Sequence, residues 1–205
     1  MSVVVLISGR GSNLEAILDA GVPVSGVISN KADAKGLQIA ARRKVPARIV
    51  EHRAFAAREA FEAELAAEID RFAPKLVALA GFMRILTPGF AERYAGRLVN
   101  IHPSLLPAFP GLATHERALA AGVKLHGCTV HYVTAALDHG PIILQAAVPV
   151  LRGDTPDTLA ARVLRQEHQV YPRAIRWILE DRLVSETGVV RVKGDDAQLV
   201  FTDRT

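Results

Sequence analysis

Short runs of Val, Ile and Leu alternate along the chain with longer stretches rich in Ala, Glu, Leu and Arg. Apolar residues fill successive positions in several runs, as in parallel strands that helices cover on both faces. The longer stretches contain good helix formers. The predicted strands are Val3–Ile7, Val24–Ser29, Leu76–Ala80, Leu98–Ile101, Val130–Val133 and Ile142–Ala147, and the predicted helices are Asn13–Ala20, Lys35–Lys44, Ala54–Phe72 and Thr114–Ala121. This alternation predicts an α/β fold with a doubly wound, mostly parallel sheet and helices on both faces.

The C-terminal part of the chain follows a different pattern. From Thr155 to Arg182 the spacing predicts one long helix, bent at Pro172. Beyond it, apolar and polar residues alternate as in short antiparallel strands, with turns at Gly188 and Gly194. We therefore expect a short β tail after the long helix.

Composition restricts the class of protein. The chain has 205 residues, of which 50% are hydrophobic and 22% charged, enough to bury one substantial core. No apolar run approaches the roughly 18 residues that span a bilayer, so we expect a soluble, cytoplasmic protein without membrane contact. The net charge of +4 comes from scattered Arg residues, so nucleic-acid binding is not predicted. The single cysteine, Cys128, excludes an internal disulfide and is interpreted as a small buried residue.

Unusual polar and glycine-rich segments follow several predicted strands. They are Ser8–Asn13, Gly81–Arg84, Asn100–His102 and Leu137–Gly140. In a doubly wound sheet, ligands bind at the carboxyl ends of the strands, near a switch in strand order. We therefore expect these four segments to form one site.

The segment Ser8–Asn13, "SGRGSN", joins the first predicted strand to the first predicted helix. Its glycines permit a tight turn, and free amides at the positive helix end can hold a phosphate. Alternatively, Ser12 or Asn13 only caps the helix. Leu14 replaces the third glycine of the dinucleotide fingerprint, and no convincing ribose-binding acid ends the second strand, where the sequence reads "SNK". A monophosphate is thus favoured over NAD, which argues against a dehydrogenase.

Asn100 and His102 are two residues apart at a strand end, so both point to the same face. Pro103 keeps His102 extended. An amide can stabilise an oxyanion and an imidazole can transfer a proton near neutral pH, a combination that suits acyl-type chemistry. A structural role for His102 is the alternative.

Three other polar residues have two interpretations each. Asp138 lies in a good turn sequence, yet it would orient His102 if it folded back to it. His131 either lines the pocket or is a hydrogen-bonded core histidine. Glu167 falls within the apolar stripe of the long helix, so it needs either a basic partner or a ligand. The His residues lack metal-ligand spacing, and no metal is predicted.

Seven segments together resemble one family. They are "VVLISGRGSNLEAIL", "VISNKADAKGL", "LAGFMRIL", "NIHPSLLPAFPG", "HGCTVHYV", "LDHGPIILQ" and "RVLRQEHQVYP", in this order between Val3 and about Leu183. The chain is similar to the phosphoribosylglycinamide formyltransferases, folate-dependent enzymes of purine synthesis. The resemblance implies a formyltransferase fold over 1–205, with a Rossmann-like, phosphate-binding half (1–100), a catalytic and folate-binding half (101–183) and a β tail (184–205).

The resemblance also implies substrates and site residues. The co-substrate would be 10-formyltetrahydrofolate and the acceptor glycinamide ribonucleotide, without a metal. Catalysis would depend on Asn100, His102 and Asp138. The ribonucleotide would bind Gly11, Ser12, Asn13 and Glu167. The folate would contact Arg58, Met83, Arg84, Ile85, Leu86, Asn100, Thr134, Leu137 and Asp138.

Three residues depart from the family's pattern. Arg10 stands where many members have Asn, Ala108 replaces a common Lys, and His139 replaces the first Gly of "LDGGP". The last change could alter the folate-side loop. The oligomeric state cannot be predicted from the sequence.

Other functions remain as alternatives. A formyltetrahydrofolate hydrolase would usually carry a regulatory N-terminal domain, and a methionyl-tRNA formyltransferase an extra C-terminal domain, for which the chain has no room. A nucleotide-binding module without catalysis is excluded only if Asn100, His102 and Asp138 converge.

Overall fold

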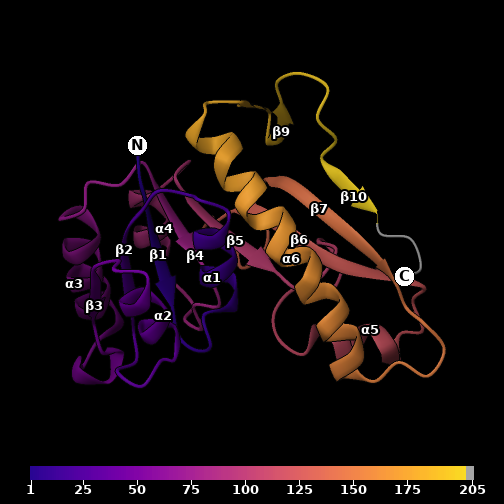
Figure 1. Ribbon diagram of the computed structural model, residues 1–205, viewed down its shortest axis with the longest axis horizontal. Coiled ribbons are helices and arrows are strands. Elements are labelled where there is room, and N and C mark those ends of the chain that lie inside the picture. The colour runs from indigo at the N-terminus through magenta and orange to yellow at the C-terminus, as the bar shows by residue number, and fades with distance from the viewer. Residues whose placement is uncertain (202–205) are drawn as a thin grey trace. The chain divides into compact units, whose positions relative to one another are not determined.

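The computed structural model describes residues 1–201, which fall into two compact units (Figure 1). The first unit spans Met1–Asn100 and the second begins at Ile101. The first contains β1 (Val3–Ile7), α1 (Ser12–Asp19), β2 (Val24–Ser29), α2 (Gly36–Arg42), β3 (Ala47–Ile49), the 3-10 helix η1 (His52–Ala54), α3 (Arg58–Asp70), β4 (Leu76–Leu79), α4 (Pro88–Arg93) and most of β5 (Leu98–His102).

The strands of the first unit are parallel and lie in the order β5-β4-β1-β2-β3. All five residues of β1 are fully buried, because β1 lies in the middle of the sheet and its apolar side chains are covered on both faces. The chain proceeds outward from β1 to β3 and then crosses back to β4. Since such crossovers are right-handed, α1 and α2 lie on one face and α3 and α4 on the other. The switch in strand order therefore falls between β1 and β4.

The second unit is built around an antiparallel pair of strands. It contains α5 (Thr114–Ala120), β6 (Leu125–Tyr132), β7 (Ile142–Pro149), α6 (Pro156–Leu179), β8 (Leu183–Glu186), β9 (Val189–Val192) and β10 (Leu199–Phe201). The last two residues of β5 belong to this unit, and β6 is their neighbour in the strand order. Helix α6 packs on β6 and β7. The predicted doubly wound, mostly parallel α/β fold is confirmed.

The predicted elements are largely found, with differences at the edges. β1 and β2 have the predicted bounds, whereas β6 begins five residues before the predicted start at Val130. The predicted helix Ala54–Phe72 is shorter, because Phe55 and Ala57 are extended between η1 and α3. β3 and α4 were not predicted. Helix α6 continues through Pro172.

The predicted antiparallel tail is correct for β8 and β9, which pair around the turn at Gly188. It is wrong for β10, which pairs with β7 in parallel. The side chain of Gln198 accounts for this, since its amide donates to the carbonyls of Ile143 and Val190 and so joins β7 to the hairpin. The predicted tail also includes residues 202–205, which lie outside the described part of the chain. Across residues 1–201, every helix is too short or too polar to span a lipid bilayer.

Candidate active site

His102 is the last residue of β5, and both nitrogens of its buried ring face oxygen acceptors. Nδ1 lies 3.4 Å from Oδ2 of Asp138. Nε2 lies 3.0 Å from the backbone carbonyl oxygen of Phe109. Asp138 thus folds back to His102, although 35 residues separate them in the chain. An imidazolium, which carries a proton on each nitrogen, would find an acceptor on both sides of this ring.

Asp138 is held in place by its own backbone and by a neighbouring loop. Its φ of 53° is in the left-handed region, an unfavourable conformation for a residue with a side chain. Oδ2 accepts a hydrogen bond of 2.8 Å from the backbone N–H of Gly111. Two residues later, Gly140 is required, because a Cβ there would lie 1.7 Å from the carbonyl oxygen of Tyr132. The loop that carries Asp138 is therefore closely packed at its end.

His131 lies on the other side of the Asp138 carboxylate. Its Nε2 is 3.9 Å from Oδ1, and its Nδ1 is 2.9 Å from the carbonyl oxygen of Tyr132, to which it donates. Burial lowers the pKa of His131, and the Tyr132 carbonyl and Asp138 offset this only in part. The two interpretations of this residue are thus compatible: His131 is a buried, neutral histidine and also a neighbour of the candidate site.

His126 and His115 form a pair that was not predicted from the sequence, and His126 contacts the loop that follows His102 at Phe109. Nε2 of the buried His126 is 3.2 Å from Nδ1 of His115, on α5. The ring of Phe109 packs edge-on against His126, with centroids 5.9 Å apart. Burial lowers the pKa of His126 to about 4 and also lowers that of His115. This neutral pair therefore supports the segment whose carbonyl contacts His102.

The structure of the loop between β1 and α1 favours the anion-binding interpretation over the one in which Ser12 or Asn13 caps the helix. The N-cap of α1 is Gly11, which provides no side-chain hydrogen bond, so neither Ser12 nor Asn13 is the cap. Gly11 has φ 81°, and a Cβ there would lie 2.6 Å from Cα of Gly36. The loop can thus form this tight turn only with glycine. No side chain caps the helix amides at this end, where the helix dipole favours a negative charge.

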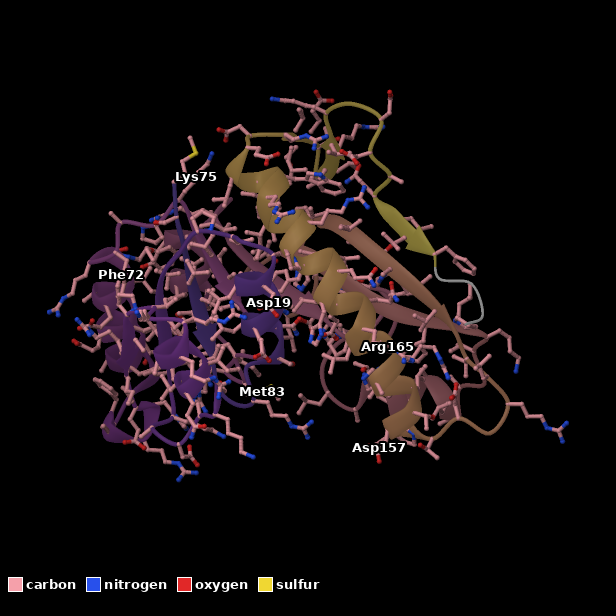
Figure 2. All side chains as sticks on the ribbon, viewed as in Figure 1. Asp19, Phe72, Lys75, Met83, Asp157 and Arg165 are labelled. Carbon is pink, nitrogen blue, oxygen red and sulfur yellow. The ribbon has the colours of Figure 1, made fainter. Side chains whose placement is uncertain are left out.

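The segment after β4 carries four of the predicted folate contacts of the first unit, Met83 to Leu86. Met83 and Ile85 are 62% and 60% exposed, and Figure 2 shows Met83 at the surface of this unit. At the far end of the segment, the backbone N–H of Thr87 donates to Oε1 of Glu62 at 2.8 Å. Large exposed apolar side chains on an anchored loop are typical of ligand-binding surfaces. Arg84 and Leu86 are half-buried in the same segment, and Arg58 is exposed at the start of α3.

The remaining predicted residues lie in the second unit. Leu137 is 53% exposed, and the hydroxyl of the exposed Thr134 donates to the Ala136 carbonyl at 3.3 Å. Glu167 is buried on α6, and its charge adds to burial in raising the pKa of the Cys128 thiol. Cys128 is therefore buried and uncharged, as expected. Within residues 1–201, no three His, Cys, Asp or Glu side chains are grouped to hold a metal ion.

Comparisons with known proteins identify the family. The family model for formyl transferases matches residues 1–175. The chain is 54% identical to the phosphoribosylglycinamide formyltransferase of Escherichia coli (strain K12) over 189 residues, which cover 89% of each chain. It is 43% identical to the enzyme of the same name from Haemophilus influenzae over 187 residues, 88% of each chain. The crystal structure of phosphoribosylglycinamide formyltransferase from Anaplasma phagocytophilum matches with a TM-score of 0.93 at 44% identity, covering 99% of both chains. The chain therefore belongs to the formyl transferase family.

Proposed function

We propose that this chain transfers the formyl group of 10-formyltetrahydrofolate to the amine of glycinamide ribonucleotide, a step of purine biosynthesis, in the cytoplasm. The relatives that match nearly its full length carry the name of this activity. The observation that carries the proposal is the placement of His102 between a carboxylate and a backbone carbonyl at a strand end. No metal is needed for this reaction.

The chemistry requires one new bond and one broken bond at the formyl carbon. The amine nitrogen of the ribonucleotide attacks this carbon, and the carbonyl oxygen becomes the oxyanion of a tetrahedral intermediate. When the intermediate collapses, the bond to N10 of the folate breaks. N10 takes up a proton and the former amine loses one, which gives tetrahydrofolate and the formylated ribonucleotide. The amine attacks directly, so no covalent enzyme intermediate is formed.

His102 and Asn100 stabilise the oxyanion in this proposal. Both are on β5 and, two residues apart, point to the same face. The distance of 3.4 Å between Nδ1 of His102 and Oδ2 of Asp138 is longer than a typical hydrogen bond. We propose that the Nδ1 proton is shared between this carboxylate and the oxyanion. His102 then assists proton transfer to N10, and Asp138 orients the ring.

The binding residues follow from the local chemistry and the family. The phosphate binds the backbone amides of Gly11, Ser12 and Asn13 at the start of α1, and Glu167 accepts hydrogen bonds from the ribose or glycinamide. The folate ring system binds apolar side chains that are exposed in the structure, and its carboxylates pair with arginine. We assign the folate to Arg58, Met83, Arg84, Ile85, Leu86, Asn100, Thr134, Leu137 and Asp138.

The alternative is hydrolysis of the same folate, in which water replaces the amine. The test is to follow folate absorbance with purified protein and 10-formyl folate, in the presence and absence of glycinamide ribonucleotide. We expect turnover only with the ribonucleotide, and a decrease in kcat of about 10²- to 10⁴-fold in His102→Ala. Thermal melting of the variant controls for loss of the fold. Folate consumption without the acceptor would identify a hydrolase, and binding without turnover would leave a binding module.

A further inference from the structure

Three polar side chains form a hydrogen-bonded series inside the first unit. Ser8 follows β1, Asn30 follows β2, and His52 begins η1 after β3. Ser8 and Asn30 are 4% and 1% exposed. The Ser8 hydroxyl donates to Oδ1 of Asn30 at 2.6 Å, and Nδ2 of Asn30 lies 3.2 Å from Nδ1 of His52. We call Ser8, Asn30 and His52 the polar relay.

The inner end of the polar relay reaches the segment after β4. The backbone N–H of Met83 donates to the Ser8 hydroxyl oxygen at 2.8 Å. The Ser8 hydroxyl donates its single proton in the hydrogen bond to Asn30. A lone pair of its oxygen therefore remains to accept the hydrogen bond from the Met83 N–H. Because β2, β1 and β4 are neighbours in the sheet, this series crosses the switch in strand order. One hydroxyl thus joins the start of the phosphate-binding loop to the proposed folate-binding segment.

The outer end of the polar relay is held by His52. Its Nδ1 makes one of two hydrogen bonds with Asn30, depending on the tautomer: it accepts from Nδ2 of Asn30, or it donates to the backbone carbonyl oxygen of Asn30, which lies 2.9 Å away. The imidazole ring packs edge-on near the buried ring of Phe61, with centroids 6.4 Å apart. In either tautomer His52 is bonded to Asn30, the residue that receives the Ser8 proton.

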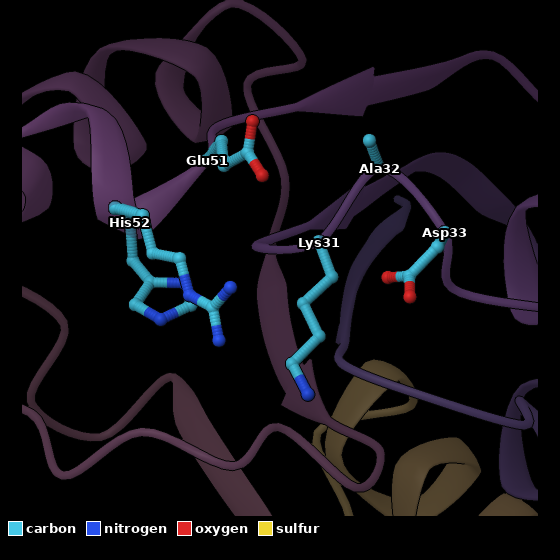
Figure 3. Close-up of a pocket in the computed structure, with 6 residues that line it drawn as sticks. Lys31, Ala32, Asp33, Glu51 and His52 are labelled. Carbon is cyan, nitrogen blue, oxygen red and sulfur yellow. The ribbon is translucent and has the colours of Figure 1, made fainter.

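His52 borders a surface pocket of about 220 Å³ (Figure 3). The charged side chains at this pocket have both signs and are exposed, so they indicate no particular ligand; they are Lys31, Asp33, Glu51 and Arg53. His52 and the other residues that line this pocket are not assigned to either substrate, so substitution of His52 leaves the proposed substrate contacts in place.

We propose that Ser8, Asn30 and His52 are positioning residues for formyl transfer, which hold Met83 and the segment Gly81–Leu86 in the conformation that binds the folate. This inference rests on the proposed function. The segment exposes Met83 and Ile85, so burial of these side chains does not stabilise it before the ligand binds. Phe82 is buried and anchors the start of the segment, and the Met83 hydrogen bond to Ser8 fixes the backbone in its middle. A preformed segment lowers the ordering cost of binding.

The structural part of the proposal is tested by hydrogen–deuterium exchange of the peptide that contains Gly81–Leu86. In Ser8→Ala we expect the Met83 amide to exchange about fivefold to tenfold faster, as for loss of one hydrogen bond. His52→Ala should give a smaller increase, and His52→Gln, which can again accept from Asn30, should restore much of the protection. Arg53→Ala is the matched control, adjacent to His52 but outside the polar relay, and should change nothing. Unchanged exchange in both Ser8→Ala and His52→Ala would overturn the proposal.

The functional part is tested by steady-state kinetics of the same variants. His52→Ala should raise KM for the formyl folate severalfold, with kcat and the KM for the ribonucleotide within about twofold of wild type. A purely structural role would instead lower the melting temperature and leave KM unchanged, which would overturn the positioning role. If the wild-type protein transfers no formyl group, the proposed function fails, while the exchange experiment still decides whether the polar relay holds Met83. If Ser8→Ala does not fold, His52→Ala and His52→Gln carry the test.

Discussion

The His126–His115 pair predicts how stability depends on pH. In the folded chain, burial lowers the pKa of His126 to about 4, with smaller contributions from His115 and His102. In the unfolded chain we expect the ordinary value of about 6.5. As the pH falls below about 6.5, the unfolded state takes up a proton that the folded state does not, so the free energy of unfolding decreases. The contribution of neutral His126 to the free energy of unfolding is complete above about pH 6.5 and is lost as the pH falls to about 4.

The magnitude follows from the two pKa values. A difference from about 6.5 to about 4 corresponds to a total of about 3 kcal/mol in the free energy of unfolding. Most of this stabilisation is lost within the accessible pH range: about 1 kcal/mol at pH 5.5 and about 2 kcal/mol at pH 5. His115, whose pKa is also lowered, adds a loss of the same sign.

The assay is urea unfolding at several pH values between 5 and 7.5, followed by the fluorescence of Trp177. This residue is buried on α6, in the same unit as His126. In His126→Gln, which cannot titrate, the loss of stability between pH 7 and pH 5 should be about 2 kcal/mol smaller than in wild type. His139→Gln, at an exposed position, is the control and should retain the wild-type dependence. An unchanged pH dependence in His126→Gln would refute the reasoning, whatever its stability at pH 7.

Three further substitutions test separate parts of the structure. Asp138→Asn keeps an acceptor oxygen but removes the charge beside His102, so kcat for formyl transfer should fall about 10²-fold or more, while the exposed Asp157→Asn should not change it. Gly11→Ala introduces a Cβ against the backbone of α2 at positive φ, and should raise KM for the ribonucleotide and destabilise the chain by about 1–3 kcal/mol, measured by urea unfolding. Ile143→Ala creates a cavity in the core of the second unit and should cost about 2–5 kcal/mol in the same assay.

The core of the fold could be predicted because its signal is local. β1 is apolar at every position, since both of its faces are covered, and its bounds were found without error. β3 is only three residues long and α4 only six, too short for a period to be recognised. β10 was predicted as part of an antiparallel tail but pairs with β7 in parallel, and the Gln198 bonds that support this pairing reach residues distant in sequence.

The candidate site could be predicted only in part, because several of its contacts join residues that are distant in the sequence. The common face of Asn100 and His102 follows from strand geometry, so the sequence contains it. The contact between His102 and Asp138 depends on the left-handed backbone of Asp138 and on the amide of Gly111, neither of which has a signal in the sequence. The His126–His115 pair was missed altogether, because each histidine looks isolated when its element is considered alone.

The structural role of Asn30 could not be predicted from its residue type alone. From the sequence, the segment "SNK" after β2 was informative only because it lacks the acid that binds a dinucleotide's ribose. In the structure, the Asn30 side chain is buried and turned inward, where it bonds to Ser8 and His52. It is thus unavailable to a ribose at this position. The same bonds reach the Met83 backbone through Ser8, so the feature that argues against a dinucleotide also supports the segment proposed to bind folate.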